Sequence, residues 1–323
     1  MKYYLLDNPP GADNKFNVGD DIQSLAAKRY LPKIDGWINK GRLSEYKGDT
    51  AKIISNGWFI HKPEYWPPSL DLLPLYISFH VNENVKNAML NSIGVEHLRK
   101  YSPIGCRDFS TLNIMKENGI PAWFSGCLTL TLEREKYCTK NAREGIYFVD
   151  VLYKMHSQKP DNLFGIVKHK IRKKDKSEVD RIRLIESIFS SSLLDNVQKI
   201  THSCAVGDNS REFRLMYADT VLRKYANAQL VVTSRIHCAL PCLAFGTPVI
   251  FIDGGLNDKS ERCRLDGLTD WFNTISITDN GEFSNNFDIN FPISPNTPIQ
   301  NKELHIEYAN KLIEKCESFI NNR

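Results

Sequence analysis

Residues 229–254 compress a strand, a turn, a helix and a second strand into one short stretch, written QLVVTS, RIHCALPCLAFG and TPVIFIDG. Apolar runs that alternate with a helical segment in this way are typical of a βαβ unit in a parallel sheet. Open α/β sheets bind their ligands at the carboxyl ends of such strands. The turn at residues 233–237 therefore marks the place where a ligand site is expected.

The rest of the chain repeats this alternation, which predicts an α/β protein with parallel sheets. Gly19 or Asp20 is expected to cap the first helix. In the first half, strands are expected at 3–6, 52–55, 75–81, 105–107 and 122–124, and helices at 21–30 and 109–118. In the second half, strands are expected at 145–149, 197–201, 230–233 and 249–252, and helices at 177–189, 210–227 and 303–320.

A length of 323 residues suits two domains. Residues 133–144 are rich in charge, lack apolar periodicity and separate two α/β patterns, so they mark the boundary. We expect an N-terminal α/β domain at 1–138, a C-terminal α/β domain at 139–302, and a helix at 303–323 that packs back on the first domain. The predicted fold class is α/β, with two Rossmann-like parallel-sheet domains facing a cleft.

Composition argues against several classes of protein. Hydrophobic residues at 41% and charged residues at 25% are ordinary for a globular chain and speak against disorder and coiled coil. The N-terminal apolar run ends at Asp7, too early for a signal peptide, and no stretch reaches the roughly 18 apolar residues of a membrane span, so a cytoplasmic protein is expected. The eight cysteines show no C-x-x-C pairs, so we expect neither a disulfide framework nor a structural metal site.

The net charge of +4 is small and by itself implies no nucleic-acid partner. The densest basic run, residues 168–176, has two interpretations. It is either a solvated loop or a contact with an anionic acceptor or with the membrane surface. The second interpretation would make the protein peripheral to the inner face of the membrane.

The turn at the end of the first strand of the βαβ unit carries residue types suited to an anionic ligand. Thr233 or Ser234 can cap the following helix and offer backbone N–H groups to an anion, and Arg235 adds a bidentate donor for phosphate or carboxylate. His237 can exchange a proton near neutral pH. Pro241 lacks an N–H group and clashes with the carbonyl of His237, which places His237 at the helix start or at a kink. The alternative is that Arg235 and His237 only close a buried turn.

A second group of candidates surrounds the start of the first predicted helix. The carboxylate of Asp20 already occupies the positive potential there, so this helix is a poor phosphate site and a better acceptor site. Asp20 could orient or deprotonate a sugar hydroxyl, with Asn17, Gly19 and Gln23 as further acceptor-binding candidates. The alternative role of Asp20 is that of a helix cap.

Further candidates follow other predicted strands. His202 ends the strand at 197–201 and either faces the same crevice or is a buried histidine satisfied by hydrogen bonds. Arg107, Asp108 and Ser125 border the predicted cleft on the acceptor side, although a structural ion pair would equally explain Arg107 and Asp108. The donor-side candidates after the last strong strand are Gly254, Gly255 and Glu261, followed by Arg262 and Arg264.

Four sequence blocks together resemble one protein family. They are NVGDDIQ, then PIGCRDFST with FSGCLTLTL, then ITHSCAVGDNSREFR, and finally VVTSRIHCALPCLAFGTPVIFI. Their order and content, over roughly residues 17–262, are similar to those of polysaccharide pyruvyl transferases. The resemblance implies a GT-B-like fold, with residues 1–138 on the acceptor side and residues 139–302 on the donor side.

The same resemblance implies a function. Phosphoenolpyruvate would be the donor and co-substrate, without other cofactor or metal, and a sugar or lipid-linked oligosaccharide of a surface polysaccharide would be the acceptor. Arg235 and His237 would belong to the donor site, with Arg235 neutralising the donor and His237 acting as general acid or base. Two alternatives stay open: a GT-B-like glycosyltransferase that uses a nucleotide sugar, and a non-catalytic carbohydrate-binding protein.

Overall fold

The structure is a computed structural model that describes residues 1–11, 13–59, 63–139, 142–155, 180–205, 207–256, 258–278 and 280–322. The basic run at 168–176 lies outside these residues. No helix within the described ranges is long and apolar enough to cross a membrane.

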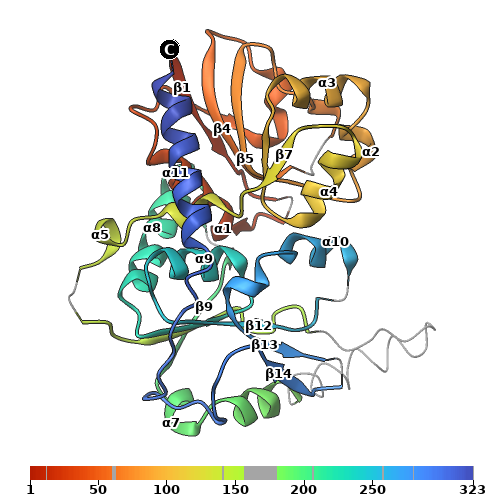
Figure 1. Ribbon diagram of the computed structural model, residues 1–323. Coiled ribbons are helices and arrows are strands. Elements are labelled where there is room, and N and C mark those ends of the chain that lie inside the picture. Colours follow the sequence, from red (N-terminus) through yellow and green to blue (C-terminus); the bar gives the residue numbers. More distant parts are fainter. Residues whose placement is uncertain are drawn as a thin grey trace.

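A first sheet is built from the N-terminal part of the chain, in the upper half of the view in Figure 1. Each pair of neighbours in it runs parallel. The strand order is β3 (Gly36–Asn39), β1 (Lys2–Asp7), β4 (Ala51–Phe59), β5 (Leu72–Val81), β6 (Ile104–Cys106) and β7 (Ala122–Phe124).

A second sheet is built from residues C-terminal to the first, in the lower half of that view. All of its neighbouring pairs are parallel except β13 with β14, which is antiparallel. The strand order is β14 (Phe283–Asn285), β13 (Asn273–Ile277), β12 (Val249–Asp253), β11 (Leu230–Thr233), β8 (Ile146–Val149) and β9 (Val197–Ile200). The predicted α/β fold with two Rossmann-like, mainly parallel sheets is therefore confirmed.

Helices pack around both sheets and between them (Figure 1). The α-helices are α1 (Val18–Lys28), α2 (Lys86–Met89), α3 (Ser92–Lys100), α4 (Phe109–Glu117), α5 (Arg134–Tyr137), α7 (Ser191–Leu194), α8 (Arg211–Asn227), α9 (Ile236–Ala244), α10 (Lys259–Arg262) and α11 (Ile306–Asn321), with a further helical stretch at 180–188. The 3₁₀ turns are η1 (Lys40–Glu45), η2 (Pro63–Tyr65), η3 (Leu128–Thr131), η4 (Cys263–Leu265) and η5 (Thr269–Trp271).

One hydrophobic core cluster joins the two halves of the chain. It includes Val18 and Ile22 of α1, Leu222 of α8 and Leu240 of α9, all fully buried. A short antiparallel ladder between β2 (Phe16–Asn17) and β10 (Ser203–Cys204) adds a second link. Both links hold the start of α1 next to the second sheet.

Three local expectations differ from the structure. The first helix begins at Val18 rather than residue 21, and its cap is Asn17, whose side chain accepts a hydrogen bond from the Gly19 N–H, so neither Gly19 nor Asp20 is the cap. Strand β4 runs beyond the predicted 52–55 to Phe59, because the polar Asn56 is buried inside it and hides the apolar pattern. The last helix starts at Ile306 rather than at residue 303, and Leu304 is 59% exposed.

Candidate active site

The carboxyl ends of strands from both sheets meet at one small cavity of about 50 Å³. Trp58 lies near the end of β4, Arg107 follows β6, His202 follows β9 and Arg235 follows β11. This placement is the one expected for ligands of open α/β sheets. The complete lining is Asn17, Asp20, Trp58, Arg107, His202, Arg235, Ile236, His237 and Arg264.

Arg235 is held between two residues of the turn that follows β8. Its Nε donates to Asp150 Oδ2 at 2.7 Å, and its guanidinium carbon lies 3.6 Å from the centroid of the Tyr153 ring. Both contacts fix the plane of the guanidinium while leaving its terminal nitrogens as possible donors to a ligand.

Thr233 and Ser234 have structural roles instead of the predicted capping role. The Thr233 hydroxyl donates to Val149 O at 2.9 Å and accepts from the Arg235 N–H, and the Ser234 hydroxyl donates to Ile252 O at 2.7 Å. Arg235 occupies the N-cap position of α9 without a side-chain cap hydrogen bond. The expectation that Thr233 or Ser234 caps this helix is wrong, because backbone carbonyls of neighbouring strands engage both hydroxyls.

His237 is the second residue of α9, so it lies at the helix start, one of the two positions that Pro241 allowed. Its ring packs on α1 so closely that a Cβ built on Gly19 would lie 2.9 Å from the His237 Cβ. Its Nε2 is buried and has no hydrogen-bond partner among the described residues. Burial lowers the pKa of His237 well below its usual range, with further lowering by Arg107 and Arg264, so its imidazole is neutral.

His202 combines both interpretations offered by the sequence. Its side chain lines the cavity, yet it is 1% exposed and its Nε2 lies 2.7 Å from the Tyr225 hydroxyl. Burial, reinforced by Arg235, lowers the pKa of His202 to about 3. It is therefore a neutral wall of the cavity with a fixed orientation.

The start of α1 brings Asp20 into the cavity. Asn17 Nδ2 and Gln23 Nε2 donate to its two carboxylate oxygens at 3.3 and 3.2 Å. Gln23 is 3% exposed, packs against Gly57 and does not line the cavity, whereas Asn17 does. Gly19 serves the site by allowing the close approach of His237. The proposed cap role of Asp20 is taken by Asn17.

Arg107 is 1% exposed, and its Nε and Nη2 have no hydrogen-bond partner within the described part of the chain. The carboxylate of its neighbour Asp108 lies 3.5 Å from Arg107 Nε. That carboxylate already contacts His80 Nδ1 at 2.5 Å, and it caps the start of α4 by accepting a hydrogen bond from the Thr111 N–H. The structural ion pair is therefore weak, and Arg107 shares its cavity with Arg235. The Ser125 hydroxyl accepts a hydrogen bond from the Ser78 N–H of β5 and donates one to the Cys106 carbonyl of β6. Ser125 does not line the cavity.

Trp58 and Ile236 line the cavity but were not candidates, and Arg264 was named only as following the donor-side candidates. Arg264 lies over the ring of Trp58, with 5.4 Å between its guanidinium carbon and the ring centroid. Arg264 belongs to a 3₁₀ turn after α10, and Trp58 falls within a long strand, so neither stands at a recognisable turn signal. Of the other donor-side candidates, Gly254, Gly255 and Glu261 do not line the cavity.

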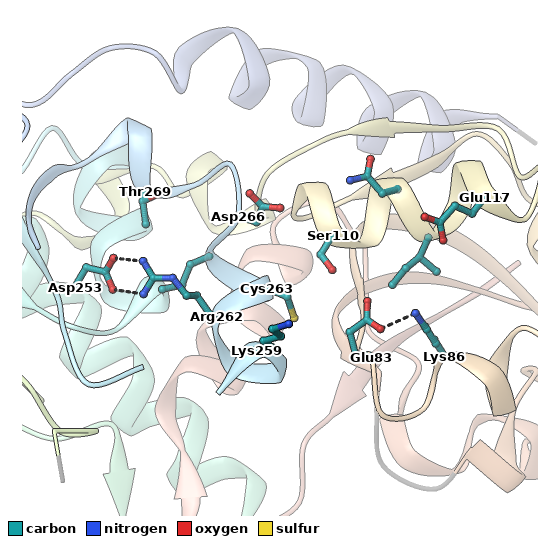
Figure 2. A pocket seen from close by; sticks show the side chains of 13 residues that line it. Glu83, Lys86, Ser110, Glu117, Asp253, Lys259, Arg262, Cys263, Asp266 and Thr269 are labelled. Carbon is teal, nitrogen blue, oxygen red and sulfur yellow. Dashed lines mark hydrogen bonds and ion pairs between the residues drawn. The ribbon is translucent and has the colours of Figure 1, made fainter. Parts of the chain in front are cut away.

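A larger, more open groove of about 670 Å³ is lined by other residues (Figure 2). Ser110 and Glu117 of α4 face Arg262 and Asp266 from the second half of the chain across it. Ion pairs of Glu83 with Lys86 and of Asp253 with Arg262 fix part of the lining. Its lining includes residues close in sequence to Arg107 and Arg264 of the cavity, such as Ser110, Cys263 and Leu265.

The cavity can bind a small anion next to groups that can move a proton. Arg107, Arg235 and Arg264 supply positive charge, and His237 and Asp20 supply an imidazole and a carboxylate. Among the described residues, no group of three or more His, Cys, Asp or Glu side chains is placed to hold a metal ion.

A family model for polysaccharide pyruvyl transferase matches residues 17–255. The chain belongs to the polysaccharide pyruvyl transferase family. It is thus an enzyme of a class that acts in polysaccharide biosynthesis, and a sugar of a polysaccharide is the class of acceptor that this family implies. The matched range carries every cavity residue of this pyruvyl transferase except Arg264.

Likenesses to solved structures are distant. An uncharacterised protein of Klebsiella pneumoniae shares 12% identity, with a TM-score of 0.47 over 86% of this chain and 93% of that one. The ADP-heptose LPS heptosyltransferase II of E. coli shares 10% identity, with a TM-score of 0.24 over 98% and 99% of the chains. No curated protein matches the chain significantly.

Proposed function

We propose that the enzyme transfers a pyruvyl group from phosphoenolpyruvate to two hydroxyls of one sugar, forming a cyclic ketal on a surface polysaccharide or its lipid-linked precursor. The observation that supports this donor is Arg107, a buried guanidinium whose Nε and Nη2 find no hydrogen-bond partner among the described residues, in one small cavity with Arg235 and Arg264. A buried cation without a partner is costly, and a compact anion supplies the missing charge and hydrogen-bond acceptors.

The charge of the cavity suits this donor. Phosphoenolpyruvate carries a carboxylate and a phosphate, and a phosphate of this kind bears about −1.5 to −2 charges at pH 7. Each charge-assisted hydrogen bond from an arginine contributes roughly 1.5–3 kcal/mol. A nucleobase is a poorer occupant, because Trp58, the aromatic residue of the lining, has Arg264 over its ring.

His237 is the proposed general acid. The methylene carbon of the donor must gain a proton, which makes the adjacent carbon electrophilic, and one sugar hydroxyl then attacks that carbon. The second hydroxyl displaces phosphate, so the two hydroxyl protons appear in the new methyl group and in the released phosphate. Burial, with further lowering by Arg107 and Arg264, holds the pKa of His237 low. Negative charge from the donor offsets the two arginines and so prepares His237 to carry a proton.

The acceptor enters from the side of Asp20. This carboxylate is held by Asn17 and Gln23 and is placed to orient or deprotonate a sugar hydroxyl. The groove in Figure 2 adds polar side chains, including those of Asn113 and Thr269, for contact with the neighbouring parts of the acceptor.

Thermal unfolding with candidate donors tests the proposal. A ligand that binds only the folded state adds RT ln(1 + [L]/Kd), about 2.7 kcal/mol at a hundredfold excess over Kd. Phosphoenolpyruvate should raise the melting temperature, UDP, GDP and CMP should not, and Arg235→Ala should abolish the shift. A shift with a nucleotide alone would instead support the glycosyltransferase alternative. His237→Ala should keep the shift and lose roughly 10²–10⁴-fold in turnover.

A further inference from the structure

The turn at residues 150–155, directly after β8, is held in an unfavourable backbone conformation. Asp150 and Leu152 have φ values of 47° and 55°, a left-handed region that residues with a Cβ seldom adopt. Such conformations persist only where the surroundings impose them, and they gather at functional sites. The contacts around this turn therefore indicate what it is for.

Three contacts from other elements hold the turn. The N–H of Leu152 donates to the Ser234 hydroxyl at 3.0 Å, and Lys154 Nζ pairs with Glu261 at 2.5 Å. Gly255 lies so close that a Cβ there would be 2.5 Å from the backbone nitrogen of Met155. Ser234, Gly255 and Glu261 thus lie outside the donor cavity and yet fix the turn that borders it.

The 150–155 turn also contacts two of the cavity arginines. Asp150 Oδ2 accepts from Arg235 Nε at 2.7 Å and from the His202 N–H at 2.9 Å. The guanidinium carbon of Arg235 lies 3.6 Å from the centroid of the Tyr153 ring, and the Tyr153 hydroxyl accepts a hydrogen bond from Arg264 Nη2 at 3.4 Å. A single tyrosine therefore contacts both Arg235 and Arg264.

We propose that the 150–155 turn is the positioning element of the donor site, with Tyr153 and Asp150 as positioning residues for Arg235 and Arg264. Neighbouring guanidinium groups repel one another, and each loses side-chain freedom when it binds a ligand. An aromatic face attracts a guanidinium without neutralising it, so the stacked arginine keeps its charge for the donor. This inference rests on the proposed function, since it names the residues that shape the donor site.

Titration calorimetry with phosphoenolpyruvate tests the role of the ring. Tyr153→Leu removes the face beneath Arg235 and should weaken binding about tenfold, as expected for loss of a partly buried cation–π contact. Tyr153→Phe keeps the face and loses only the long hydrogen bond to Arg264, so its affinity should stay within about threefold of wild type. The matched control is Tyr65→Leu, which removes a similar contact with Arg42, 5.6 Å from that ring, outside the cavity.

The outcomes separate positioning from general stability. Rescue by Phe alone does not exclude a fold defect, because Phe would also restore lost packing. A fold defect would lower the melting temperature of Tyr153→Leu without ligand, so we expect that temperature to stay near the wild-type value. Unchanged donor affinity in Tyr153→Leu would overturn the inference, and so would a Phe variant as weak as Leu. If wild type does not bind phosphoenolpyruvate, the proposed function fails, and the same variants are titrated with inorganic phosphate. Phosphate binding that depends on the Tyr153 ring would still support the inference, and absence of both ligands would overturn it.

Discussion

At the scale of single residues, Arg107 and Arg214 form an informative pair. Both are almost fully buried, at 1% and 3% exposure. Arg214 Nη2 contacts Asp7 Oδ1 at 2.5 Å, whereas Arg107 lies 3.5 Å from a carboxylate that His80 and Thr111 already engage. Burial lowers the pKa of Arg107. The empty protein therefore keeps one arginine in an environment that favours a bound anion.

We expect Arg107→Met to raise the melting temperature of the empty protein by at least about 2 °C, because it removes a buried charge without a good partner. The same variant should lose the stabilisation by phosphoenolpyruvate. Differential scanning calorimetry with and without donor measures both effects. Arg214→Met is the matched contrast and should lower the melting temperature, since it removes the arginine that pairs with Asp21 and one of the two that pair with Asp7. A destabilised Arg107→Met would show that this arginine supports the fold.

At the scale of elements, helix α11 connects the two halves of the molecule. In Figure 1 it starts beside the lower half and runs up along the first sheet. The buried ammonium of Lys52 in β4 donates to the carbonyls of Phe319 at 2.7 Å, of Ile320 at 3.3 Å and of Asn322. A cation placed at the carboxyl end of a helix is favoured by the helix dipole, so Lys52 serves as the cap that α11 needs.

Lys52→Met should destabilise the protein by roughly 1–3 kcal/mol, because it leaves carbonyls at the end of α11 without their donor. Hydrogen exchange should quicken in the last turn of α11 first. Lys311→Met is the control: that lysine lies over the Trp123 ring on an exposed part of the same helix, 4.4 Å from the ring centroid. Equal effects of the two changes on exchange would contradict the capping role.

At the scale of the whole molecule, an ion network joins the two halves next to the active site. Asp7 of β1 and Asp21 of α1 face Arg211 and Arg214 of α8. Asp21 is 2% exposed, and its Oδ2 has no hydrogen-bond partner among the described residues. Burial raises the pKa of Asp21 to about 7, only partly opposed by Arg214, and Asp20 raises it further.

This raised pKa predicts a pH-dependent stability. Between pH 4 and 7 folded Asp21 holds a proton that the unfolded chain releases, so its contribution to stability falls as pH rises through this range. Asp21→Asn removes the effect and should be more stable than wild type at pH 8, by an amount on the order of 2–4 kcal/mol that disappears near pH 4. Urea unfolding at several pH values measures it. A difference that does not change with pH would exclude titration of Asp21 as the cause.

Local sequence by itself determined the order of the main elements and the principal candidates. The apolar run of β11 matches its predicted bounds, because its continuous burial leaves a clear pattern, and the bounds of the half-buried β7 match as well. Arg235 and His237 were identified because they follow such a strand directly. Trp58 and Tyr153 could not be identified in this way, since Trp58 lies inside a long strand and the 150–155 turn carries no periodic signal.

Tertiary structure decided which of the candidates share a cavity. The sequence shows that Arg107, His202 and Asp20 stand near the ends of predicted elements, but the pairing of strands and the packing of α1 on α9 bring their side chains together. It also decided that Thr233, Ser234 and Gly255 support the site from outside, because their hydrogen bonds and close contacts are made with segments far away in sequence. Burial and charge at a site are sums over such distant neighbours, which no local pattern records.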